Sequence, residues 1–398
     1  MKTGPRYIFS VNEGGAAVYD IAIHCPDGKG VTPQIGISYN SQNAGYGLAG
    51  YGFSLSGFSA ITRGGKKPFN NDGVAAGVGY GADDNLYLDG KRLILISGSA
   101  FTSGAEYCLE GAPYTKVIVH ESTPDNMTPS WFEVQAPDGM KYEYGHSDTS
   151  RLLFTHSGNK KCVASWHLNR TEDVYGNYAT YSYEISNLQV YPKRIDYGEN
   201  SVKARGVSHR IEFDYGSNHG KYTEFNIGSA RGGTWQRLSS VTTYTGTTVY
   251  RKYYLSYDSN SDGTGLKFDR LISVREENGD GESLTPVKFT WDTLPAVSLR
   301  QSEFNIPTKD SAPNVTNEHA NFFAADLNGD GVSDIIRVSP VTITDGTDTE
   351  NHIYVYVSRS KVSANGSVNY EKPIIYILPQ PFYMSNIKTS LGGASLLD

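Results

Sequence analysis

Apolar residues occupy every second position in most segments of this chain. Tyr19, Ile21 and Ile23 share one face of such a segment, and the residues between them lie on the other. The same period recurs in residues 35–39, 140–144, 181–185, 211–215, 253–257 and 287–291. A period of two predicts half-buried antiparallel β-strands. The run from Leu93 to Ile96 is apolar on both faces, which predicts a strand covered on both sides.

Turn sequences separate these segments. Asp89-Gly90, Asp138-Gly139, Gly176-Asn177 and residues 278–281 each favour a hairpin connection. The glycine-rich stretch GYGLAGYGFSLSG, residues 45–57, is followed by no helix that could help to hold a phosphate. It therefore predicts tight turns or close sheet packing. The fold class that results is all-β, a large antiparallel sheet built from successive hairpins.

Composition supports this fold class. The 398 residues include 43 Gly, 29 Tyr and 15 Phe but only 4 Met, which is typical of strands joined by turns. Tyrosine recurs on one strand face, where its ring can pack on a neighbour while its hydroxyl stays hydrated or bonded. A sheet lined in this way can form the wall of a shell as well as a solid core.

Charge and cysteine usage narrow the function classes. The net charge is −7, with no block of Lys or Arg, which disfavours nucleic acid and anionic membranes as partners. Cys25, Cys108 and Cys162 are far apart and odd in number, and indicate neither a disulfide framework nor a zinc site. No membrane span is expected from the hydropathy. The first residues carry no secretory signal, so we expect export by another route or a start inside a longer chain.

The composition changes after Trp291. Residues 292–320 contain several prolines and little alternation, and are predicted to link a first domain, residues 1–291, to a second, residues 321–398. The second has about four strand-like segments, the size of one blade of a β-propeller. A single blade cannot bury its own faces, so this one needs neighbours.

The loop DLNGDGVSD, residues 326–334, predicts a calcium site. Its ligands would be Asp326, Asn328, Asp330, the carbonyl of Val332, and Asp334. Oxygen donors at alternate positions around a glycine suit calcium, and carboxylates this close repel one another without a cation. An EF-hand is excluded because position twelve is Arg337 and both flanks are strand-like. A turn without metal remains the alternative.

Motifs for catalysis are missing. The sequence has no G-x-S-x-G, HExxH or P-loop pattern, and its nine histidines show no metal-ligand spacing.

Several segments together resemble a known family. PQIGISYNSQNAGYGLAGYGFSLSGFSAITRGGK, residues 33–66, is similar to the signature of the amino-terminal domain shared by SpvB and the B component of insecticidal toxin complexes, in the Rhs/YD-repeat group. Further matching segments, in order, are NLYLDGKRLILIS, WFEVQAPDGMKYEYG, SWHLNRTEDVYGNYATYSYE and RLISVREENGDGESLTPVKFTW. Phe53 departs from the pattern, which usually has Trp there. Residues 322–338 resemble the FG-GAP or VCBS calcium loop of integrin-type propellers.

The resemblance implies a non-enzymatic part of a secreted or surface toxin-related protein, with a cytoplasmic stage before release. Its β-shell would enclose or present an effector region, and its propeller would dock to a translocating partner. Neither the catalytic set of an ADP-ribosyltransferase nor the aspartyl self-cleavage site of an Rhs shell can be placed in the sequence. Two alternatives remain, a surface adhesin and a glycan-active β-sandwich enzyme.

Overall fold

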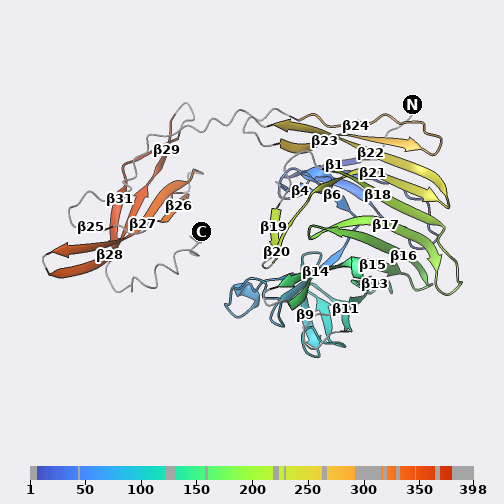
Figure 1. The fold of residues 1–398 in the computed structure, drawn as a ribbon, viewed down its shortest axis with the longest axis horizontal. Coiled ribbons are helices and arrows are strands. Elements are labelled where there is room, and N and C mark those ends of the chain that lie inside the picture. The colour runs from blue at the N-terminus through green and yellow to red at the C-terminus, as the bar shows by residue number, and fades with distance from the viewer. Residues whose placement is uncertain are drawn as a thin grey trace. The chain divides into compact units, whose positions relative to one another are not determined.

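In the computed structural model the regular structure of the described residues is almost entirely β-strand, which confirms the predicted all-β class (Figure 1). It describes residues 7–43, 45–121, 131–156, 160–217, 224–227, 230–261, 267–291, 315–316, 321–328, 332–345, 347–363 and 368–378. Two 3-10 turns, η1 (Pro68–Asn70) and η2 (Asp148–Ser150), interrupt the strands. The described residues form no helix that could cross a membrane. The chain divides into unit 1, Met1–Val297, and unit 2, Ser298–Asp398.

Eight strands of unit 1 form a closed ring. They are β7 (Ala60–Gly64), β8 (Asn85–Leu88), β9 (Lys91–Ser97), β10 (Glu106–Leu109), β11 (Ala112–His120), β12 (Trp131–Gln135), β13 (Lys141–Tyr144) and β15 (Lys160–Glu172). The long strand β15 closes the ring because its two edges have different partners. On one edge the backbone N–H of Gly145 donates to the carbonyl of His167, and on the other Leu168 donates to Ser59. Strand β14 (Arg151–His156) pairs with the first half of β15.

The same sheet continues from β15 away from the ring. The further strands are β16 (Asn177–Ser186), β17 (Gln189–Asn200), β18 (His209–Ser217), β21 (Gln236–Thr245), β22 (Thr248–Ser261), β23 (Lys267–Asn278) and β24 (Val287–Lys288). Each pairs antiparallel with the next, as the hairpin pattern predicted. A separate hairpin, β19 (Glu224–Ile227) with β20 (Ala230–Gly233), lies beside this sheet.

An amino-terminal sheet packs against the far end of the large one. Its strands are β1 (Tyr7–Val11), β2 (Ala17–Ala22), β3 (Gly36–Asn40) and β6 (Phe53–Ser56), with the short pair β4 (Tyr46–Gly47) and β5 (Gly50–Tyr51) between the last two. Phe53 is fully buried, with its ring centroid 5.1 Å from that of Phe289. Trp291 lies 5.7 Å from Tyr39 in the same cluster. Aromatic contacts therefore join the first strands of unit 1 to its last.

Close approach explains the glycines of residues 45–57. A Cβ on Gly47 would lie 1.9 Å from the carbonyl oxygen of Phe53, and one on Gly57 would lie 2.1 Å from that of Gln34. The carbonyl of Leu48 accepts a hydrogen bond of 2.7 Å from the N–H of Leu238. The stretch is a tight crossing between sheets, as predicted.

The tyrosines also behave as expected. Their hydroxyls bind the backbone of neighbouring segments: Tyr253 accepts from His24 (3.0 Å), while Tyr197 donates to Pro26 (2.9 Å), Tyr215 to Pro192 (2.7 Å) and Tyr257 to Leu238 (2.7 Å). Burial raises the pKa of all four. The bonds of Tyr253 and Tyr197 hold residues 24–26, which lie outside the named strands, and those of Tyr215 and Tyr257 reinforce neighbouring strands.

The prediction for Leu93 to Ile96 is wrong. In β9 only Leu93 is buried, at 4% exposure, and Ile96 is 58% exposed. Residues of an apolar run need not be covered, because much of a protein's surface is apolar. The end of β9 projects past the core instead of crossing it.

The described residues of unit 2 form a five-stranded antiparallel sheet and a separate two-stranded one. The strands of the larger sheet are β25 (Val315–Thr316), β26 (Asn321–Ala325), β27 (Asp334–Asp345), β28 (Asp348–Ser358) and β31 (Ile374–Leu378), with β29 (Ser360–Val362) and β30 (Val368–Tyr370) paired apart from it. Of the predicted linker 292–320, residues 292–314 and 317–320 lie outside the described residues, while β25 pairs with β27. The boundaries at 291 and 320 and the propeller interpretation stay predictions.

Candidate metal loop

The acidic loop connects β26 to β27. Ala325 pairs with Asp334 at its base, so strands flank it on both sides. Asp326 and Asn328 are exposed, whereas Asp334 is fully buried. Asp330 lies outside the described residues. The geometry of the complete predicted ligand set therefore stays a prediction.

Asp334 organises the backbone around the loop. Its Oδ1 accepts a hydrogen bond of 2.6 Å from the N–H of Ser360, and its Oδ2 accepts one of 3.1 Å from the N–H of Leu327. The Ser360 hydroxyl lies 3.0 Å from Oδ1 and 3.2 Å from the carbonyl oxygen of Val332. This carboxylate thus ties the loop to the start of β29.

These contacts also set the charge of Asp334. Burial alone would raise the pKa of its carboxyl, but the hydrogen bonds from Ser360 and Leu327 outweigh burial and hold the pKa below its ordinary value. The group is therefore a carboxylate at neutral pH.

The loop fits a hard cation in its donor types. Asp326, Asn328 and the Val332 carbonyl offer oxygen only, which is what calcium prefers. Asp334 has less to offer, because a carboxylate has about four lone-pair sites and backbone N–H groups already occupy two of them. Among the residues that the structure describes, no three His, Cys, Asp or Glu side chains come together to hold a metal. A calcium site here would depend on the exposed side of the loop.

Arg337, which served in the sequence only to exclude an EF-hand, is a fully buried residue of unit 2. Its guanidinium lies 4.7 Å from the ring centroid of Tyr356, its partner across the strand pair. Stacking of this kind stabilises a buried cation. The period-two pattern around it does not reveal this role, because Arg is normally expected on the exposed face.

Unit 1 contains a buried ion pair that the sequence pattern did not predict. Arg63 Nη1 lies 3.0 Å from Asp84 Oδ2, and both side chains are almost completely buried. The Nε of Arg63 donates to the carbonyl of Val163 at 2.9 Å, and the guanidinium lies 4.5 Å from the ring of Phe101. The ion pair thus joins β7 to the residue before β8, and the bond to Val163 joins β7 to β15. The partners of Arg63 come from three separate segments, so sequence spacing gives no signal for the pair.

Ser165 and His167 form the described contact closest to a catalytic pair. Ser165 Oγ lies 3.0 Å from His167 Nε2, and burial lowers the pKa of His167 to about 4. Positions i and i+2 always share a strand face, so this contact follows from β15 itself. Activation of a serine further needs a third group that orients the histidine. The ring of Tyr183, 5.4 Å from His167, supplies packing and not such a group.

The comparisons with known proteins give the fold. No family model and no curated protein matches the sequence. The structure is similar to the Tc holotoxin pore of Photorhabdus luminescens with a mutated TccC3, with a TM-score of 0.59 and 16% identity over 96% of this chain. It is similar to TcdB2-TccC3, with a TM-score of 0.56 and 16% identity over 94% of this chain. This chain spans 20% of the length of each of those two.

A third similar structure is the amino-terminal domain of the effector protein SpvB from Salmonella typhimurium strain LT2. The TM-score is 0.50 and the identity 16%, over 65% of this chain and 98% of that domain. At such low identity the likeness establishes the fold and not the activity. The chain has the fold of the SpvB amino-terminal domain and of part of the TcdB2-TccC3 chain, as its sequence motifs predicted.

Proposed function

We propose that this chain is the non-catalytic part of a toxin-complex-B-like or Rhs-like protein that encloses an effector region and docks to a partner. The observation that carries the proposal is the likeness to the Tc holotoxin pore over 96% of the chain. Large sheets reinforced by tyrosine–backbone hydrogen bonds suit a wall.

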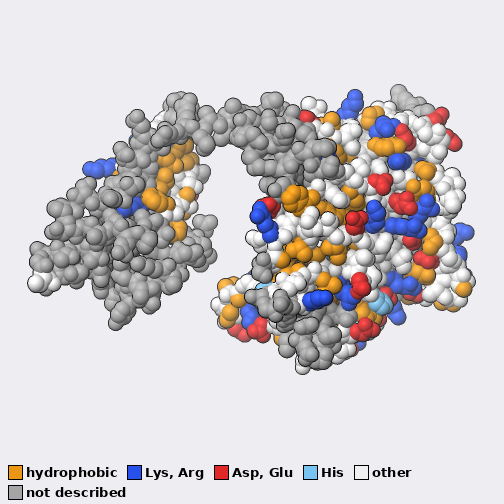
Figure 2. Space-filling model, viewed as in Figure 1, with side chains coloured by type: hydrophobic (Ala, Val, Ile, Leu, Met, Phe, Trp, Pro, Cys, Tyr) orange, Lys and Arg blue, Asp and Glu red, His pale blue; other side chains and the backbone are white. Residues whose placement is uncertain are grey.

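The partners in this proposal are a toxin effector region and a translocating protein. The surface of unit 1 in Figure 2 shows acidic and basic side chains interspersed, with no large field of one sign. Such a surface supports protein partners over nucleic acid. The protein would act after secretion or at the cell surface.

Unit 2 would begin a calcium-stabilised propeller that provides the docking face. Strand β31, the last in the order of the described sheet, exposes all five of its residues, Ile374–Leu378. An exposed apolar edge strand is normally covered by a neighbour. This supports the interpretation of unit 2 as one blade that packs against others.

Limited proteolysis tests the enclosure. The complete reading frame that contains this chain should be expressed and digested under native conditions. We expect its carboxy-terminal region to resist the protease until the shell is unfolded with denaturant. A carboxy-terminal region that is digested as fast as a free peptide would argue against enclosure.

An activity assay tests the absence of catalysis. The chain should be incubated with a panel of glycans and the products analysed by mass spectrometry. We expect every glycan to remain intact. Cleavage that persists after repurification would favour the alternative of a glycan-active enzyme.

A further inference from the structure

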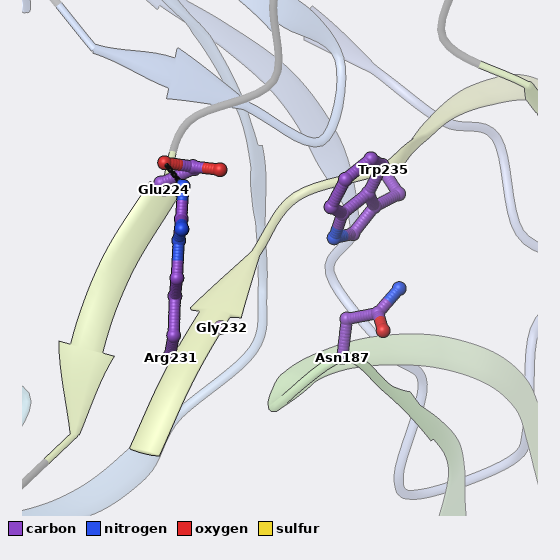
Figure 3. Close-up of a pocket in the computed structure, with 5 residues that line it drawn as sticks. All are labelled: Asn187, Glu224, Arg231, Gly232 and Trp235. Carbon is purple, nitrogen blue, oxygen red and sulfur yellow. Dashed lines mark hydrogen bonds and ion pairs between the residues drawn. The ribbon is translucent and has the colours of Figure 1, made fainter. Parts of the chain in front are cut away.

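A hollow in unit 1 lies outside all the features described above. It has a volume of about 370 Å³ and is lined by Asn187, Glu224, Arg231, Gly232 and Trp235. Small-molecule sites usually measure roughly 300–1,000 Å³. This volume suits one or two rings of a small ligand. In the view of Figure 3 the side chains of Trp235 and Asn187 lie on one side of Gly232, and those of Arg231 and Glu224 lie on the other.

The backbone beneath the hollow is held in place. The N–H of Gly233 donates to the carbonyl of Asn187 at 3.0 Å, and the N–H of Trp235 donates to the Tyr191 hydroxyl at 3.1 Å. A Cβ on Gly232 would lie 2.8 Å from the carbonyl oxygen of Asn187, so only glycine allows this close packing. The side chains of Asn187 and Trp235 are thus presented from a fixed frame.

Trp235 offers an apolar surface to the hollow. Its side chain is 41% exposed, although it is one of only four tryptophans in the chain. The face of an indole ring carries partial negative charge and attracts the weakly positive C–H groups of a flat ligand. An exposed indole beside polar groups is typical of a binding surface.

The polar groups of the hollow compensate one another in charge. Arg231 on β20 forms an ion pair with Glu224 on β19, and both side chains are partly exposed, at 70% and 37%. A guanidinium has five donors and a carboxylate about four acceptor sites, which is more than one ion pair uses. A balanced pair favours a neutral ligand that both donates and accepts hydrogen bonds, over an anion or a cation.

We propose that this hollow binds a neutral pyranose sugar, with one face of the ring on Trp235 and its hydroxyls bonded to Glu224, Arg231 and Asn187. Adjacent hydroxyls can donate to the carboxylate and accept from the guanidinium at once. A nucleoside also has a flat polar ring and is therefore the competing ligand class. The net charge of −7 disfavours nucleotides, which carry phosphate.

The site is a binding site and not a cleavage site. Glycoside hydrolysis normally needs two carboxyl groups on either side of the scissile bond. Glu224 is the one carboxylate among the described residues that line the hollow. The proposal is therefore independent of the enclosing function and compatible with it.

Ligand-observed NMR on the full chain tests the proposal. The probes are methyl glycosides of glucose, galactose, mannose and N-acetylglucosamine, with adenosine as the competitor class. We expect saturation transfer to at least one glycoside. The Trp235→Ala variant should weaken its binding about tenfold or more, because the stacking face is lost, and Glu224→Gln should weaken it as well.

Tyr114→Ala is the matched control, since Tyr114 is an aromatic residue on β11 with 84% exposure. It should bind the glycoside like the unchanged chain. Circular dichroism melts show whether each variant folds. If Trp235→Ala does not fold, the binding measured with Glu224→Gln decides the outcome. The proposal is overturned if no glycoside binds, if binding survives the deciding variant, or if adenosine binds more tightly than every glycoside.

Discussion

Asp334 and Asp326 belong to the same loop, but their surroundings give the two carboxylates different roles. Asp334 is fully buried and accepts the N–H groups of Ser360 and Leu327. Asp326 is exposed. Removing a charge that satisfies buried donors affects the folded state itself, whereas removing an exposed charge affects only what it binds.

Asp334→Asn is therefore expected to destabilise unit 2 with or without calcium. The amide cannot accept from both N–H groups, and a buried unsatisfied donor costs about 1–3 kcal/mol. Asp326→Asn should act mainly on the calcium-dependent part of the stability. Urea denaturation of both variants, in calcium and in EDTA, measures this difference. Equal behaviour of the two would contradict the division of roles.

The lowered pKa of Asp334 adds a pH dependence. A depressed folded-state pKa contributes stability that is fully present above the ordinary value of 3.8 and is lost as pH falls through the folded pKa. The unchanged chain should lose this contribution on acidification below about pH 4. Asp334→Asn should show a flatter profile over that range.

Breaking the buried Arg63–Asp84 ion pair is expected to cost more stability than breaking an exposed pair. Asp84→Ala leaves the guanidinium buried without its counter-ion, and should cost about 3–5 kcal/mol. The double variant Arg63→Met, Asp84→Ala should lose less, because no unpaired charge remains. Asp83→Ala, which removes the 85% exposed partner of Lys66, should cost at most about 1 kcal/mol. Guanidinium denaturation midpoints measure the series, and a double variant as unstable as Asp84→Ala would count against this account.

Among the elements, the β4–β5 crossing depends most directly on glycine. Gly47→Ala places a Cβ 1.9 Å from the carbonyl oxygen of Phe53, and a backbone atom cannot rotate away. Strain of this kind typically costs about 1–3 kcal/mol. Gly77→Ala is the matched control, because a Cβ there meets nothing within 4 Å. Thermal melts should separate the two, and equal melting temperatures would show that the crossing can relax.

Strand β22 anchors the amino-terminal segment through a tyrosine hydroxyl. Tyr253→Phe leaves the N–H of His24 without its acceptor while the ring packing is retained. We expect a loss of about 1–3 kcal/mol. Tyr114→Phe, at a position 84% exposed, should change stability by less than about 0.5 kcal/mol. Faster hydrogen exchange at His24 would identify the broken bond, and unchanged exchange would refute the anchoring role.

For the whole molecule, the sequence predicted local elements better than their partners. Tyr181 and Tyr183 alternate and are buried on β16, and Asp89-Gly90 joins β8 to β9 with φ angles of 49° and 81°. The ring closure was not predicted, because periodicity identifies a strand's buried face but not the strand it pairs with. Trp166 pairs with Ile61, far away in sequence.

In the candidate metal loop, too, the local residues were predicted and their tertiary partners were not. Alternating oxygen donors identified Asp334 as part of the loop, but its partner Ser360 lies 26 residues further along. Nothing in the loop spacing indicates that contact. Local chemistry can be inferred from neighbouring residues, whereas a tertiary hydrogen bond depends on how β29 returns to the loop.

The division into two units leads to the last prediction, which concerns calcium. Two units with separate sheets should unfold in two calorimetric transitions, and a cation bound by the loop stabilises only unit 2. Free calcium at 100 times its dissociation constant adds about 2.7 kcal/mol, which for a domain of this size raises the melting temperature by roughly 10 °C. Magnesium should give a smaller shift, because it requires a more regular octahedral site. If neither calcium nor EDTA moves either transition, the loop is a turn without metal, which the hydrogen bonds of Asp334 and Ser360 help to hold to β29.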